Sequence, residues 1–130
     1  MVLFDTNTSQ PIKKLTEEET GFVRFLSTDA VLYTDVNSVV HMMTLEGVPL
    51  HTLPGRHYIH SPLLINESFL VTGNKDKTLD IHDITTGKTL YKFYHPSSEG
   101  FDCFTYQQEH NRLIAVNRNG KVYILESHSN

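Results

Sequence analysis

Apolar and polar residues alternate along most of this chain, in short runs separated by turn-forming residues. The clearest example is the stretch 69–93, where two alternating runs flank a polar segment at 74–77 and a turn at 85–87 leads into a third run. Alternation with a period of two is typical of half-buried β-strands, and short polar segments of this kind join antiparallel neighbours. The pattern predicts an all-β chain built of antiparallel strands.

The outer strand of each expected unit recurs at a nearly constant spacing. Residues 12–15 (IKKL) return as 50–53 (LHTL) and as 90–93 (LYKF), at offsets of 38 and 40 residues. A period near 40 is typical of the four-stranded blades of a β-propeller. We therefore expect the end of one blade, a complete blade, a second complete blade with the clearest pattern, and a blade that lacks its outer strand. Their bounds are 1–15, 22–53, 59–93 and 101–125.

Local signals refine this prediction. Asn119-Gly120 between two alternating runs predicts a hairpin with a type I′ turn, in which Gly120 has a positive φ. Residues 16–19 are the one place where we expect a helical turn. We expect burial at eight apolar positions of the strands, namely Leu32, Leu70, Leu79, Ile81, Leu90, Ile114, Val122 and Ile124.

Residues 53–93 resemble one repeat of the WD-repeat β-propeller family. The family pattern has a Gly-His pair before the first strand, a Ser/Thr-Gly strand end, an Asp in the following hairpin, a Trp-Asp pair and a Gly turn. One residue is inserted in the Gly-His pair, and His82 replaces the Trp, which the chain lacks altogether. The matching positions are Gly55, His57, Thr72, Gly73, Asp76, Ile81, His82, Asp83, Gly87 and the strand 90–93.

The resemblance implies roles for several of these residues. His57 would lie before the first strand of its blade and bond the turn residue Asp76, a buried link that stabilises only if both partners are satisfied. An exposed loop histidine is the alternative. Asp83 would take the family's strand-end position. Independently of the resemblance, Asp76 in a tight turn is expected to accept a bond from the backbone two residues on.

Catalytic and metal sites have weaker support. His57 and His60 form an H-x-x-H pair, but zinc usually needs a third and a fourth ligand, and Cys103 is isolated. Asp80 and Asp83 could act as paired carboxylates, yet alternation places Asp80 on the solvated face. We found no nucleophile, phosphate-loop or metalloprotease motif. We predict no enzyme, cofactor or metal; a small all-β enzyme or metal-binding domain using His57 and His60 is the alternative.

Composition narrows the classes of partner. The 130 residues carry a net charge of −4, with no long run of one sign, which gives no basis for nucleic-acid or membrane binding. No apolar run approaches the roughly 20 residues that span a bilayer. The single cysteine, Cys103, suits a reducing compartment. We expect an intracellular protein, cytoplasmic or nuclear.

Aromatic and arginine side chains near the expected loops suggest a protein interface, because such interfaces use these residues as anchors. The candidates for partner contact are Arg56, Tyr58, Tyr94, Arg112 and Arg118. The alternative is that most of the aromatic rings pack between blades. The function that we predict is a non-catalytic protein-interaction scaffold.

The strand count raises a question of closure. Thirteen expected strands make about three blades, whereas propellers close with about 4–8. The arc would be completed by a second copy, in a homodimer or larger complex, by a different protein, or by further blades of a longer chain. For a second copy, we expect the strand at 12–15 to fill the edge beside 121–125.

Overall fold

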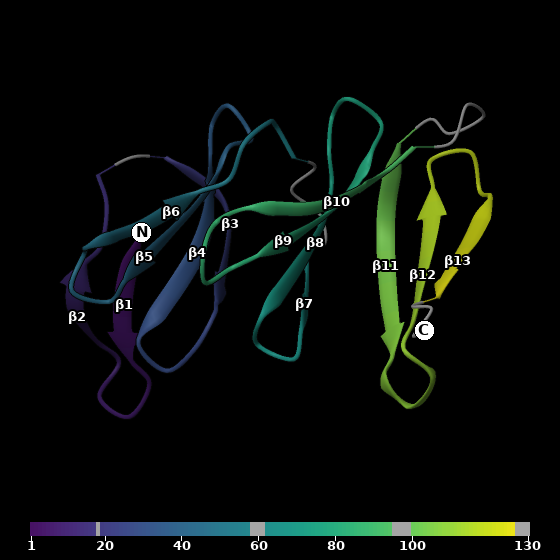
Figure 1. Ribbon diagram of the computed structural model, residues 1–130. Coiled ribbons are helices and arrows are strands. Elements are labelled where there is room, and N and C mark those ends of the chain that lie inside the picture. The colour runs from purple at the N-terminus through teal and green to yellow at the C-terminus, as the bar shows by residue number, and fades with distance from the viewer. Residues whose placement is uncertain (18, 58–61, 95–99, 127–130) are drawn as a thin grey trace.

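The structure is a computed structural model that describes the chain except for residues 18, 58–61, 95–99 and 127–130. The described residues form thirteen β-strands in four antiparallel sheets, which follow one another in chain order (Figure 1). The first and the fourth sheet lie at opposite ends of this row. The prediction of an all-β, antiparallel chain is confirmed.

The first two sheets contain two and four strands. The first sheet pairs β1 with β2, and the second has the strands in sequence order. Their bounds are β1 (Val2–Asp5), β2 (Gln10–Lys14), β3 (Thr20–Phe25), β4 (Ala30–Asp35), β5 (Val40–Thr44) and β6 (Pro49–Thr52).

The third sheet has four strands and the fourth has three, with β13 at an edge. The strands are β7 (Leu63–Ile65), β8 (Phe69–Gly73), β9 (Leu79–Asp83), β10 (Thr89–Phe93), β11 (Phe101–Gln107), β12 (Arg112–Asn117) and β13 (Val122–Glu126). The 3₁₀ helix η1 (Gln108–His110) lies between β11 and β12. No helix in the described part of the chain is long and apolar enough to cross a membrane.

The helical turn expected at 16–19 is not found in the described residues of that segment. The backbone N–H of Leu15 donates to the carbonyl of Met1 at 2.9 Å, and the carbonyl of Thr16 accepts from the N-terminal ammonium at 3.3 Å. These bonds extend the pairing of β1 with β2, so the segment leaves β2 alongside the N-terminus instead of coiling.

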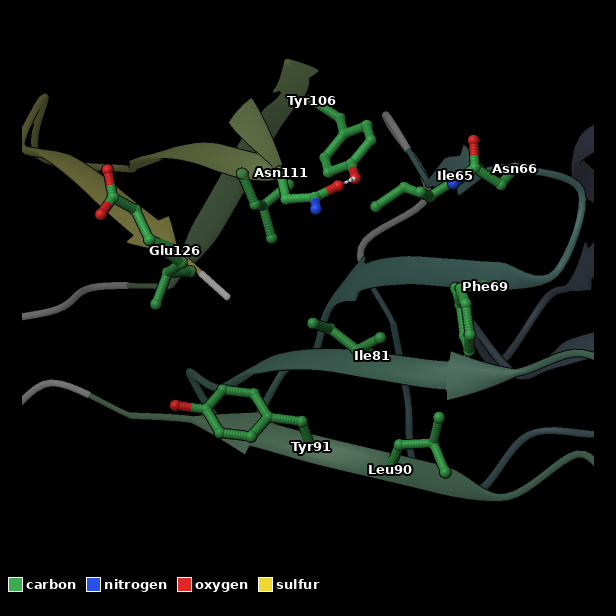
Figure 2. Close-up of a pocket in the computed structure, with 11 residues that line it drawn as sticks. Ile65, Asn66, Phe69, Ile81, Leu90, Tyr91, Tyr106, Asn111 and Glu126 are labelled. Atoms are coloured by element: carbon green, nitrogen blue, oxygen red, sulfur yellow. Dashed lines mark hydrogen bonds between the residues drawn. The ribbon is translucent and has the colours of Figure 1, made fainter. Parts of the chain in front are cut away.

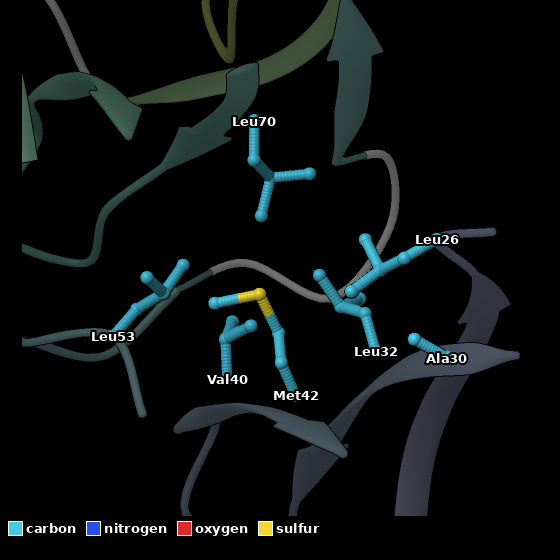
Figure 3. Close-up of a cluster of buried hydrophobic side chains, with 7 residues drawn as sticks. All are labelled: Leu26, Ala30, Leu32, Val40, Met42, Leu53 and Leu70. Carbon is cyan, nitrogen blue, oxygen red and sulfur yellow. The ribbon is translucent and has the colours of Figure 1, made fainter. Parts of the chain in front are cut away.

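Successive sheets pack face to face through three apolar clusters. Between the second and third sheets, Leu26, Ala30, Leu32, Val40 and Met42 meet Leu53 and Leu70 (Figure 3). The cluster between the third and fourth sheets contains Ile65, Val71, Leu79, Phe101, Leu113 and Ala115. The cluster between the first and second contains Val31, Tyr33 and Met43, with Met1, Leu15 and Leu45 packed against it. An inner sheet is therefore covered on both faces.

The predicted core is partly correct. Leu32, Leu70 and Leu79 are buried, and Ile81 and Ile114 are half-buried. Three predictions are wrong: Leu90, Val122 and Ile124 are 54%, 61% and 63% exposed. Leu90 lies on an outer strand beside a register shift, and the other two lie on a face of the fourth sheet that no described sheet covers.

The turns β4–β5, β8–β9 and β12–β13 have the same geometry. In each, the first residue accepts a backbone bond from the fourth, and the fourth has positive φ: Ser38 at 65°, Lys77 at 73° and Gly120 at 85°. The positive φ of Gly120 is confirmed. The type I′ turn is not, because that turn needs positive φ at two central residues and Asn119 has none.

Candidate functional site

A buried polar cluster lies between the second and third sheets. On β8 and β9, Leu70, Thr72, Asp80 and His82 share one face, because alternate residues of a strand point the same way and Thr72 pairs with Asp80. Leu70 belongs to the apolar cluster facing the second sheet, so the three polar side chains face it too. Thr72, Asp80 and His82 are fully buried.

His57 enters this cluster from the segment that links the two sheets. Its backbone N–H donates to the carbonyl of Ser38, in the β4–β5 turn, at 2.8 Å. Its side chain is fully buried and contacts Thr72 and the carbonyl of Pro54. The expected bond to Asp76 is therefore wrong: Asp76 is exposed and accepts from the backbone N–H of Thr78 at 3.0 Å, which is the local turn bond that was predicted for it.

The hydrogen bonds around His57 form a directed chain. The carbonyl of Pro54 can only accept, so Nε2 of His57 donates to it across 2.9 Å. Nδ1 of the neutral ring then accepts from the Thr72 hydroxyl at 2.8 Å. Thr72 in turn accepts from Nε2 of His82 at 2.9 Å, and Nδ1 of His82 accepts from the Thr89 hydroxyl at 3.0 Å. This order of donors and acceptors is the one that two neutral imidazoles adopt.

The electrostatics agree with neutral rings. Burial lowers the pKa of His57, and burial together with the nearby His57 lowers the pKa of His82 to about 4. The two rings meet edge to face, with centroids 5.3 Å apart. Protonating either ring would place a charge in a desolvated space and break the order of donors and acceptors.

Asp80 is the charged member of the cluster, although alternation had placed it on a solvated face. That prediction is wrong because an inner strand has a sheet on each side. Burial by itself would raise the pKa of Asp80, but hydrogen bonds from Asn74, Thr78 and Lys92 lower it overall. Their donor atoms lie 3.0, 2.6 and 3.0 Å from the carboxylate.

The ligand atoms of His57, Asp80 and His82 lie within 4.8 Å of one another, close enough for a metal ion. Every ring nitrogen, however, already has a protein partner, and the ammonium of Lys92 occupies the carboxylate. Metal binding would break these bonds. His60, the second histidine of the H-x-x-H pair, lies outside the described residues.

Asp83 has a role in the β9–β10 turn. Its carboxylate accepts from the backbone N–H groups of Thr85 at 2.8 Å and Thr86 at 3.4 Å. Asp5 makes the same bonds to Asn7 and Thr8, at the same two distances, in the β1–β2 turn. The two turns are therefore structurally equivalent, and β1 and β2 correspond to β9 and β10.

The candidate partner contacts do not all share one surface. The three equivalent turns lie along the upper rim in Figure 1. Arg118 belongs to the β12–β13 turn, and the carbonyl of exposed Arg56 accepts from Lys75 in the β8–β9 turn at 2.7 Å. Tyr94 follows β10 and is 58% exposed. Arg112 begins β12 at the opposite end of that strand and pairs with Glu126 at 2.6 Å.

Tyr58, the fifth candidate contact, lies outside the described residues. We call the surface formed by the three turns, Arg56 and Tyr94 the turn rim. Arg56 and Tyr94 are on described segments next to the third sheet, whereas Arg118 is in the turn of the fourth.

A cleft of about 650 Å³ lies between the third and fourth sheets (Figure 2). Ile81, Leu90 and Tyr91 line it from the third sheet, and Tyr106 and Leu125 from the fourth. The Tyr106 hydroxyl donates to the side-chain carbonyl of Asn111 at 2.6 Å. The sequence had indicated none of this, because the cleft is formed by residues of seven strands that come together only in the packed sheets.

We call the hydrogen bonds that run from Pro54 through His57, Thr72 and His82 to Thr89 the polar chain. The sequence predicted only part of it. The repeat pattern identified His57 and His82, but not their shared partner Thr72. One signal was available: Thr72, Asp80 and His82 occupy alternating positions of neighbouring strands, and so had to share a face.

Comparison with known proteins identifies the fold. No family model matches the sequence, and no curated protein matches it. Among solved structures, the WD40 β-propeller domain of Doa1 has a TM-score of 0.75 at 13% identity, over 93% of this chain and 42% of that one. The computationally designed Ika4 protein has a TM-score of 0.71 at 20% identity, over 96% of this chain and 78% of that one. The designed Ika8 protein has a TM-score of 0.69 at 20% identity, over 92% and 37%.

Likeness at these identities shows the fold alone. The four sheets are blades of a β-propeller, and together they form an incomplete arc. The chain spans less than half of the Doa1 domain chain and of the Ika8 chain.

Proposed function

We propose that this chain is a non-catalytic protein-interaction scaffold of the WD-repeat type, which binds a protein partner through the turn rim. The observation that carries the proposal is the repetition of one turn geometry in three successive blades, with exposed Arg56 and Tyr94 beside it. Loops placed by a rigid sheet framework commonly carry recognition. The likeness to a WD40 domain supports this reading by analogy only.

The buried polar chain supports the proposal because it holds the rim from below. His57 ties its segment to the second blade through Ser38 and to the third through Thr72. The carbonyl of the neighbouring Arg56 accepts from the backbone N–H of Lys75 in the β8–β9 turn. A binding surface that is rigid before contact loses less conformational entropy when the partner binds.

The same series of buried hydrogen bonds favours a structural role over a catalytic one. His57, Asp80 and His82 are the groups best suited to chemistry, and their hydrogen-bonding capacity is used within the fold. We place the protein inside the cell, since its cysteine, Cys103, is free and exposed. The net charge of −4 gives no attraction to nucleic acid.

The test compares the turn rim with the opposite end of strand β12. The double variant Arg56→Ala/Tyr94→Ala and the single variant Arg112→Ala are immobilised beside the unaltered protein, and proteins retained from cell extract are quantified by mass spectrometry. Arg112 is the control because it lies at the far end of its strand. We expect at least one protein whose retention falls more than tenfold with the double variant and stays unchanged with Arg112→Ala. Equal retention on all three proteins would overturn the proposal.

A further inference from the structure

The fourth blade has an apolar face that no described blade covers. On β12 and β13, Leu113, Ala115 and Leu125 point toward the third blade. The alternate residues therefore point the other way, and they include Ile114, Val116, Val122 and Ile124. Val122 and Ile124 are 61% and 63% exposed. We call this surface the trailing face.

The first blade has a matching open face at the other end of the arc. Met1 packs on the cluster shared with the second blade, so the alternate residues Val2 and Phe4 point away from it. They are 41% and 56% exposed. We call this surface the leading face.

The repeat shows that the two faces have complementary orientations. The equivalence of the Asp5 and Asp83 turns places Val2 and Phe4 at the positions of Asp80 and His82, which face the preceding blade. The equivalence of the β8–β9 and β12–β13 turns places Val122 and Ile124 at the positions of Leu79 and Ile81, which face the following blade. Each internal interface joins one face of each kind.

We propose that a second copy of this chain docks head to tail, with the leading face of one copy packed on the trailing face of the other. This inference goes beyond the proposed function, because neither face contains a residue of the turn rim. The contact would continue the series of three blade-to-blade interfaces inside the chain, with aliphatic side chains meeting Val2 and Phe4. It keeps β1 paired with β2, unlike an exchange in which β2 leaves to fill the edge of β13.

A head-to-tail contact uses different surfaces on the two partners and therefore forms either a ring or an open filament. Two copies joined through two such contacts leave neither face exposed. They contain twice the thirteen described strands of one chain, equivalent to about six four-stranded blades, which lies within the range of about 4–8 blades in closed propellers.

The decisive experiment blocks one end of each copy. Ile124→Lys places a charge on the trailing face, and Phe4→Glu places one on the leading face; both positions are exposed, so folding is not at risk. Val36→Lys is the control, because Val36 is 68% exposed in the β4–β5 turn and belongs to neither face. Each protein is examined by light scattering and sedimentation, alone and mixed, after its unfolding curve has been checked.

We expect Ile124→Lys alone and Phe4→Glu alone to be monomers, and their equimolar mixture to form a one-to-one dimer through the remaining intact faces. Val36→Lys is expected to associate like the unaltered chain. A second pair, Val122→Lys with Val2→Glu, repeats the test. A mixture that stays monomeric in both pairs overturns the proposal and assigns the open faces to other blades. The rim-binding test changes Arg56 and Tyr94, which belong to neither face, so its outcome does not depend on this one.

Discussion

Nε2 of His82 donates to the hydroxyl of Thr72 across 2.9 Å, between two strands of the third blade and out of contact with solvent. The same hydroxyl donates to His57, so a single side chain joins the two imidazoles. This makes Thr72 the centre of the polar chain beneath the turn rim. Its loss would leave two buried ring nitrogens without a partner.

We expect Thr72→Val to lower the free energy of unfolding by about 2–4 kcal/mol, because each buried polar group left unsatisfied costs about 1–3 kcal/mol. Valine has nearly the same shape, so packing is preserved. Urea denaturation at neutral pH measures the change. Thr28→Val, at an exposed position between β3 and β4, is the matched control and is expected to change stability by less than about 0.5 kcal/mol. Equal effects of the two substitutions would show that the hydrogen bonds of Thr72 do not stabilise the fold.

The stability of the fold is expected to fall as the pH falls from 6.5 toward 4. His82 has its pKa lowered from 6.5 to about 4, so in this window the unfolded chain binds a proton that the folded chain excludes. Between pH 7 and pH 4.5 we expect a loss of roughly 2–3 kcal/mol from this residue. The lowered pKa of His57 acts in the same direction.

The carboxylates act in a separate window. Asp80 and Asp35 have pKa values lowered from 3.8, so their contribution is present above that pH and is lost only as the pH falls further. Urea denaturation at pH 7, 6, 5 and 4.5 isolates the histidines. His82→Gln keeps a donor for Thr72 but does not titrate, and we expect it to flatten the slope over this range. An unchanged slope would show that His82 is not buried in its neutral form.

Two glycines with positive φ are predicted to differ in their tolerance of a methyl group. At Gly120 an added Cβ meets open space, so Gly120→Ala is expected to cost only the backbone strain, about 1–2 kcal/mol. At Gly87 the Cβ would lie 2.9 Å from ring atoms of His51, whose Nε2 bonds the carbonyl of Thr85 at 2.8 Å. We expect Gly87→Ala to cost about 1 kcal/mol more, by thermal or urea unfolding. Equal costs would contradict the contact between the second and third blades.

Much of this fold is visible in the alternation and in the 40-residue period, since both are local properties of the strands and turns. What the pattern could not supply is which face of a strand meets a neighbour. Asp80 was expected in solvent because a lone sheet has a wet face, but an inner blade has none. Val122 and Ile124 were expected in the core for the converse reason: their positions are buried in an inner blade and open in the last one described.

The polar chain was out of reach for a related reason. His57, Thr72 and His82 come from three segments, and only the register of β8 with β9 and the placement of the loop before β7 bring them together. The family resemblance indicated a buried histidine but assigned it the wrong partner. Asp76 stays on its own turn, where its carboxylate accepts from the backbone N–H of Thr78.

The open faces at the two ends of the described arc are expected to associate, leading face on trailing face. Light scattering on the 130-residue chain, combined with thermal unfolding over a hundredfold range of concentration, tests this association most directly. We expect a mass twice that of one chain and a melting temperature that rises with concentration, because association stabilises the folded state. A monomer that melts cooperatively at a temperature independent of concentration would contradict it.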